Sequence, residues 1–108
     1  MAQKTILIAC VSGMSSSLLI SKLAQVVEQA GKDYGFITSP ASKLKTDIQA
    51  VKPDVVLLAP QIQYLRDEVQ KTTALFKIPL SVINIQDYAM MDSPKIITTI
   101  ENLLNSEK

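Results

Sequence analysis

The most informative run in this chain is Asp54-Val55-Val56-Leu57-Leu58-Ala59, with Pro60 directly after it. Its aliphatic residues are consecutive, without the polar alternation expected of a strand that has one face in water. A strand that is apolar on both faces lies inside a sheet that helices cover on both sides. Proline then ends the run, because it cannot donate a ladder hydrogen bond. The run therefore predicts a central strand of a parallel sheet.

Strands and helices are expected to alternate around this central strand. The other runs of strand length span residues 5–9, 34–38 and 78–84. Four parallel strands joined by right-handed crossovers give a flavodoxin-like α/β fold with strand order 2-1-3-4 and helices on both faces. We expect one domain over residues 1–108, because a chain of 108 residues has no room for a second.

Segments of helical period separate the predicted strands. Helices are expected over residues 16–30, over a shorter polar segment after Pro40, and over residues 61–71. The last helix is expected to begin with Ser93 as its cap, followed by Pro94. The apolar positions expected to face inward from the first helix are Leu18, Leu19, Leu23, Val26, Val27 and Ala30.

Composition excludes several classes of function. The 11 basic and 10 acidic residues give a net charge of +1 and form no basic tract, so nucleic acid is not an expected partner. No apolar run is long enough for membrane insertion, and we expect a cytoplasmic protein. The chain has no histidine and a single cysteine, which rules out catalytic triads with histidine, a phosphohistidine and an internal disulfide. We expect neither a metal nor a cofactor.

The predicted topology places the candidate functional site at the loop after the first strand. Ligands of such sheets bind outside the carboxyl ends of the strands, at the point where the winding reverses, so residues 10–16 and 60–62 are expected to flank the site. Cys10 begins the first of these loops, and the backbone amides and helix amino terminus that follow it would form a nest for an oxyanion. The predicted phosphate-binding loop consists of Ser12, Gly13, Met14, Ser15, Ser16 and Ser17.

Each part of this loop also has a purely structural interpretation. Serines before a helix are commonly caps, glycine is common in turns, and a lone cysteine is commonly a small buried apolar residue. The only cysteine, however, begins a loop whose backbone amides would bind a phosphate group. This position favours the interpretation of Cys10 as a nucleophile.

Three segments resemble one bacterial protein family. The loop from Cys10 to Leu19 is similar to the active-site loop of the lactose/cellobiose-type enzyme IIB components of the phosphotransferase system, usually Cys-Ser-Ala-Gly-Met-Ser-Thr-Ser followed by leucines. The segment from Asp54 to Tyr64 resembles that family's third strand and its Gly-Pro-Gln-Ile-x-Tyr turn. The segment Tyr88-Ala89-Met90-Met91-Asp92 resembles its Tyr-Gly-x-Met-Asp segment. This chain departs from those patterns at Val11, Ser12, Ser16, Ala59 and Ala89.

The resemblance implies a cytoplasmic phosphoryl carrier, which acts as a phosphotransferase. Cys10 would accept phosphate from a phosphohistidine on a IIA component and donate it to a sugar bound by the membrane IIC component. Cellobiose, chitobiose and lactose all stay open as the sugar, because the sugar is held by the partner. An apolar docking rim around the thiol is expected from Met14, Ile62 and Tyr64, beside the loop residues Pro60 and Gln61.

Two other classes share this architecture. A low-molecular-weight tyrosine phosphatase places a nucleophilic cysteine in the same loop, with an arginine six residues later where this chain has Ser16, and Asp92 could stand in for its general acid. A non-catalytic flavodoxin-like binding module would need either an acidic phosphoacceptor site or aromatic residues that stack on a flavin. The chain has Cys10 and Pro60 in place of the acidic residues, and it contains no tryptophan.

Overall fold

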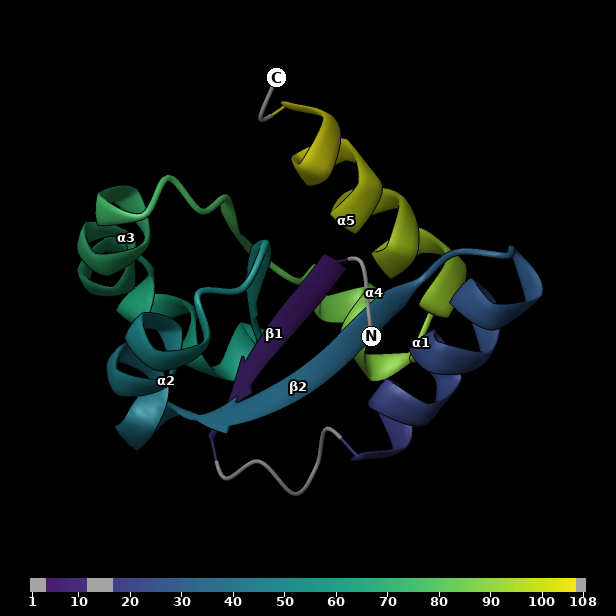
Figure 1. Cartoon of the computed structure of the whole chain (residues 1–108). Helices are drawn as coiled ribbons and strands as arrows, with labels where there is room; N and C mark the ends of the chain where they lie inside the picture. Colours follow the sequence, from purple (N-terminus) through teal and green to yellow (C-terminus); the bar gives the residue numbers. More distant parts are fainter. Residues whose placement is uncertain (1–3, 12–16, 107–108) are drawn as a thin grey trace.

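The computed structural model describes residues 4–11 and 17–106. The four strands are all parallel, in the predicted order β2-β1-β3-β4 (Figure 1). Short 3-10 helices lead into two of the α-helices. The elements in chain order are β1 (Lys4–Cys10), α1 (Ser17–Gln29), β2 (Tyr34–Pro40), η1 (Ala41–Lys43), α2 (Leu44–Val51), β3 (Val55–Leu58), η2 (Pro60–Leu65), α3 (Arg66–Leu75), β4 (Leu80–Val82), α4 (Ile85–Ala89) and α5 (Ser93–Ser106).

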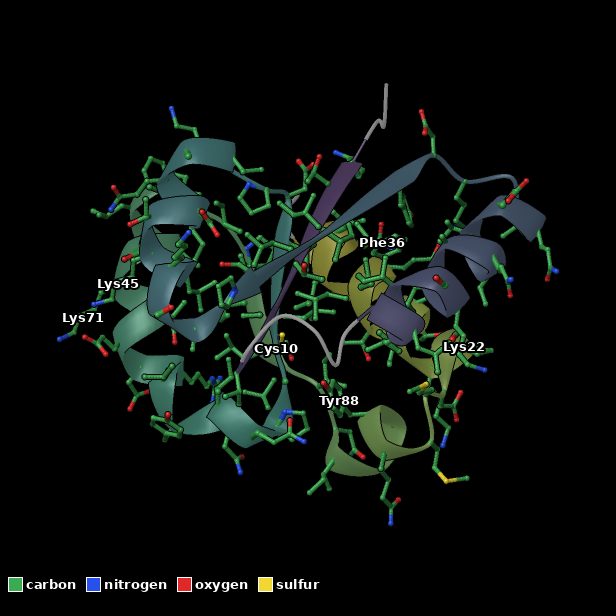
Figure 2. The ribbon with its side chains drawn as sticks, turned by 90° about the horizontal axis from the view of Figure 1, so that it is seen from below. Cys10, Lys22, Phe36, Lys45, Lys71 and Tyr88 are labelled. Carbon is green, nitrogen blue, oxygen red and sulfur yellow. The ribbon has the colours of Figure 1, made fainter. Side chains whose placement is uncertain are left out.

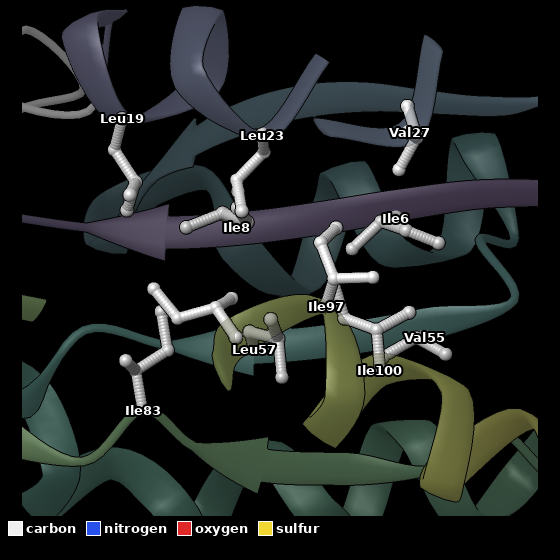
Figure 3. Packing of buried hydrophobic residues seen from close by; sticks show 11 residues of the cluster. Ile6, Ile8, Leu19, Leu23, Val27, Val55, Leu57, Ile83, Ile97 and Ile100 are labelled. Carbon is white, nitrogen blue, oxygen red and sulfur yellow. The ribbon is translucent and has the colours of Figure 1, made fainter. Parts of the chain in front are cut away.

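The sheet separates two apolar layers, because successive side chains of a strand point to opposite faces. On one face, β1 and β3 bury Ile6, Ile8, Val55 and Leu57 against α1 and α5 (Figure 3). On the other face, the intervening residues of the same strands pack against α2, η2 and α3. All four residues of β3 are buried, which confirms it as a central strand covered on both sides.

The first helix buries a narrower stripe than the sequence predicted. Leu19, Leu23 and Val27 are buried, whereas Leu18 is 57% exposed and Ala30 lies beyond the end of α1. The expectation for Leu18 was wrong because adjacent helical residues point about 100° apart, and Leu18 falls outside the stripe that is centred on Leu19, Leu23 and Val27. Gly31 ends the segment with φ 71°, a left-handed conformation that glycine adopts without strain.

The last strand is shorter than the predicted 78–84 run and is followed by a helix that the sequence pattern did not predict. Pro79 cannot donate to a ladder, although its carbonyl oxygen accepts the N–H of Val56 at 3.0 Å. After β4, Asn84 accepts the backbone N–H groups of Gln86 and Asp87 at 2.8 and 3.3 Å and thereby caps the short helix α4.

The third predicted helical segment is divided at its start. Ile62 has φ −117° and ψ 23°, so η2 is kinked there and regular α-helix begins only at Arg66.

The helix α5 has a different cap from the predicted one. Asp92 accepts the backbone N–H of Lys95 at 3.3 Å, and its carbonyl oxygen accepts the N–H of Ile96. Asp92 is therefore the N-cap. Ser93 lies inside the helix and donates its hydroxyl to the carbonyl oxygen of Met91.

None of the helices in residues 4–11 and 17–106 has both the length and the apolar character that a membrane crossing requires.

Candidate functional site

Cys10 is the last residue of β1, at the carboxyl edge of the sheet. The strand β1 lies between β2 and β3, and the register of β1 with β2 pairs Cys10 with Pro40. On the other side, the carbonyl oxygen of Ala9 accepts the backbone N–H of Ala59 at 2.9 Å. Cys10 thus leaves the sheet between two other strand ends, at the point where the winding reverses, as the predicted topology required.

The side chain of Cys10 is buried where β1 ends. Cys10 is 1% exposed and packs in the apolar cluster that includes Leu44 of α2 and Ile62 of η2. A side chain in that position has its sulfur at the border between the apolar core and the loops of the carboxyl edge (Figure 2). Chemistry on this sulfur therefore has to be approached from the loop side, since the core fills the other side.

The second predicted loop lies where expected, next to the end of β1. Pro60 opens η2, and the N–H of Ile62 closes the turn onto the carbonyl oxygen of Ala59 at 3.0 Å. Pro60 and Ile62 are buried, whereas Gln61 between them is exposed. Ile62 therefore belongs to the core rather than to an exposed docking rim.

The described part of the chain includes only the last residue of the predicted phosphate-binding loop. Ser12, Gly13, Met14, Ser15 and Ser16 lie outside the described residues. Ser17 is the first residue of α1, so the helix amino terminus follows this loop directly.

The helix α4 brings to this edge a residue, Tyr88, that was not among the predicted site residues. Tyr88 packs against both apolar layers, including the cluster that contains Cys10, and Figure 2 shows both residues at the same end of the sheet. A cavity of about 290 Å³ lies here; its lining residues are Leu19, Gln61, Ile85, Tyr88, Ala89 and Met91. The capping pattern of Asn84 after a strand is the sequence signal that predicts α4 and hence Tyr88.

Exposed apolar side chains gather at the loops of the carboxyl edge. They come from the residue after β1, the first turn of α1, η2 and both ends of α4, and they are Val11, Leu18, Tyr64, Ile85 and Met90. We call these five residues the apolar rim. Large apolar side chains that stay exposed around a polar loop are typical of a surface that binds another protein.

Asp92 is engaged in local structure. Its carboxylate caps α5 through the N–H of Lys95, which is the ordinary role of an acidic residue at a helix start. This geometry supports the structural interpretation of Asp92 over that of a general acid.

Within the described ranges 4–11 and 17–106, no three His, Cys, Asp or Glu side chains come close enough together to hold a metal ion.

The chain is similar to known proteins in both sequence and structure. The family model described as "PTS system, Lactose/Cellobiose specific IIB subunit" matches residues 5–99. The galactose-specific EIIB component of Lactococcus lactis subsp. cremoris is 40% identical over 97% of this chain and 100% of its own length. The cellobiose-specific EIIB component of Lactococcus lactis subsp. lactis has the same identity and coverage. The oligo-beta-mannoside-specific EIIB component of Bacillus subtilis is 37% identical over 85% of this chain and 87% of its own length.

Two solved structures are similar to this fold. A cellobiose-specific phosphotransferase IIB component from Borrelia burgdorferi has a TM-score of 0.78 and 27% identity, over 97% of this chain and 94% of its own. The lactose-specific IIB component domain from Streptococcus pneumoniae has a TM-score of 0.75 over 91% of this chain and 95% of its own. At 17% identity, the second likeness concerns the fold alone.

Proposed function

The chain belongs to the lactose/cellobiose-specific IIB subunits of the phosphotransferase system, and on that premise we propose that Cys10 is its phosphoryl carrier. IIB components are phosphotransferase components that work with IIA and IIC partners. The observation that supports the proposal most strongly is the position of the only cysteine at the carboxyl end of β1, beside the start of η2.

The proposed reaction is two successive transfers of one phosphoryl group. In the first, the thiolate sulfur of Cys10 attacks the phosphorus of a phosphohistidine on the IIA component, so that the P–N bond breaks and an S–P bond forms. In the second, a hydroxyl oxygen of the sugar in the IIC component attacks the same phosphorus. The S–P bond then breaks, the thiolate returns, and the hydroxyl proton passes to a base outside this chain.

The phosphoryl oxygens need donors on the loop side of Cys10. We assign this role to the backbone amides that follow Cys10, to the hydroxyls of Ser12, Ser15, Ser16 and Ser17, and to the amino terminus of α1, with Gly13 and Met14 completing the loop. All these donors are neutral. A carrier benefits from neutral donors, because it has to release the group to the next acceptor rather than hold it tightly.

The apolar rim supports a surface for protein partners. Val11, Leu18, Tyr64, Ile85 and Met90 surround the edge from which the phosphoryl group would enter and leave. We propose that IIA and IIC use this same surface in turn, with Pro60 and Gln61 contributing the backbone next to the thiol, since a single sulfur has to face both partners.

The names of the relatives indicate the class of sugar that accepts the phosphoryl group. The relatives are named for galactose, cellobiose and oligo-beta-mannosides, and two of them are equally similar to this chain. We propose a β-linked disaccharide as the acceptor and the cytoplasm as the compartment, because the donor and the loop chemistry belong to a system that delivers sugar phosphate into the cell.

A comparison of two rates on one preparation tests the carrier against the phosphatase alternative. Charge stabilisation by neutral donors alone gives slow hydrolysis, since position 16 carries serine rather than arginine. The phosphorylated protein is expected to transfer its group to a cognate IIA, or to sugar in membranes that contain IIC, far faster than it loses phosphate to water. Rapid aryl phosphate turnover that disappears in Cys10→Ser, with no transfer to any partner, would favour the hydrolase instead.

A further inference from the structure

A groove of about 360 Å³ lies at the amino edge of the sheet, opposite the edge that carries Cys10. Three lysines line it: Lys4 at the start of β1, Lys52 after α2, and Lys77 between α3 and β4. In Figure 1 this edge is at the top, where the loop from α3 to β4 and the end of α5 lie. No part of the proposed phosphoryl transfer uses these residues.

The groove carries an excess of positive charge. Its lining contains three lysines and one acidic residue, Asp54, in a chain whose total net charge is only +1. Asp54 accepts the backbone N–H of Thr5 at 2.7 Å and so is already engaged at the sheet edge. Within the described part of the chain, the ion pairs join other lysines to Glu101 and Glu68, and none involves Lys4, Lys52 or Lys77.

Two of these lysines have a strained backbone. Lys52 has φ 52° and Lys77 has φ 56°, in the left-handed region where glycine has no steric cost. A lysine within the last turn of a helix would interact with the helix dipole equally well without this strain. Lys4, moreover, lies at no helix end. The ends of α2 and α3 therefore account for a positive charge near Lys52 and Lys77, but not for their left-handed backbone or for Lys4 in the same groove.

Apart from the lysines and Asp54, the residues that line the groove are apolar, and one of them is aromatic. Lys52 holds its Nζ 5.7 Å from the centre of the Phe76 ring, and the lining also includes Pro53, Ile78, Pro79 and Leu104. A lining that combines ammonium groups with apolar side chains suits an anionic group carried on a small organic molecule. The volume lies at the lower end of the range of about 300–1,000 Å³ that small-molecule sites occupy.

We propose that this groove binds an anionic phosphate ester, with its phosphate between Lys52, Lys77 and Lys4 and its organic part against Phe76. Lysine is a common phosphate ligand because it supplies a compact positive charge with three donors. The headgroup of an anionic phospholipid has the same chemistry as a soluble phosphate ester. This site does not depend on Cys10, so its test is separate from that of the carrier.

The test is a titration of the ¹⁵N-labelled chain, followed by amide chemical shifts. Glycerol 3-phosphate is one probe, and vesicles of phosphatidylglycerol are the other. Shifts are expected at Lys52, Asp54, Phe76 and Lys77, and a Lys52→Gln/Lys77→Gln variant should lose about tenfold in affinity for the probe that binds. Binding of the ester supports a soluble ligand, whereas binding of vesicles alone supports a lipid headgroup.

The control variant is Lys22→Gln/Lys95→Gln, which removes the same charge from exposed positions on α1 and α5. It should bind the probe like the wild type. Lys52→Gly/Lys77→Gly should also lose binding, while its midpoint of thermal unfolding stays the same or rises, because glycine relieves the left-handed backbone. Equal losses in the Lys22/Lys95 control, or no shifts at the groove with either probe at millimolar concentration, would overturn the proposal.

Discussion

The backbone N–H of Ala59 lies 2.9 Å from the carbonyl oxygen of Ala9 and donates a hydrogen bond to it. This bond extends the β1–β3 ladder by one step and brings the end of β1 next to Ala59, directly before Pro60, at the carboxyl edge. Phosphorylation should therefore move amide resonances in two separate segments, the loop directly after Cys10 and the start of η2. Heteronuclear NMR of the free and phosphorylated protein measures this.

Residues at the opposite edge serve as the internal control for that experiment. The amides of Asp54 and Lys77 lie at the amino ends of the strands, and their resonances should stay in place on phosphorylation. Shifts concentrated in α5 or at the amino edge, with none near Gln61, would contradict the placement of the site.

Much of the fold was predictable because burial on both faces leaves a simple pattern. The run from Val55 to Leu58 has no polar residue, and β3 is confirmed as a central strand. The hydrogen bond between Ala59 and Ala9 follows from the predicted strand order, which placed the two loops together. The helix α4 was missed because one turn of helix has no repeating apolar period, and only the cap residue Asn84 marks it.

Other features depend on tertiary contacts that one sequence does not contain. Leu18 and Leu19 are chemically identical, and only the direction of α1 relative to the sheet decides which one is buried. The choice of Asp92 over Ser93 as the cap depends on where the chain leaves α4. The position of Tyr88 beside the cluster of Cys10 follows from the same missed helix.

The two adjacent leucines of α1 give a direct test of the packing. Leu19→Ala should lower the free energy of unfolding by about 2–5 kcal/mol, because it leaves a cavity in a fully buried layer. Leu18→Ala, at a position that is 57% exposed, should change it by less than about 0.5 kcal/mol. Urea denaturation of both variants measures the difference. Similar losses in the two would show that the helix face is wrongly assigned.

The cap of α5 is tested by substitution at position 92. Asp92→Ala should lower the free energy of unfolding by about 1 kcal/mol, since the N–H of Lys95 loses its acceptor. Asp92→Asn keeps an acceptor oxygen and should stay close to the wild type. Both variants should transfer phosphate at the wild-type rate, whereas a general acid at this position would make Asp92→Asn inactive.

The apolar rim is tested by paired polar substitutions. Ile85→Ser/Met90→Ser should raise the KM for phosphorylated IIA about tenfold with little change in kcat, because contacts that contribute to docking are lost. Leu75→Ser is the control, because Leu75 is 77% exposed at the end of α3 and far from the site. Steady-state phosphoryl transfer measures both. An equal effect of the control would contradict docking at the rim.

The role of Cys10 as the carrier is tested most directly by the identity of the phosphorylated atom. The protein is incubated with phosphoenolpyruvate, the general phosphotransferase proteins and a matching IIA, and its intact mass is measured beside that of Cys10→Ser. Circular dichroism and the urea midpoint confirm that the variant is folded. We predict that the wild type gains one phosphoryl group, located on the sulfur of Cys10, and that Cys10→Ser gains none. Labelling of Cys10→Ser to the same extent would contradict the assignment of Cys10 as the carrier.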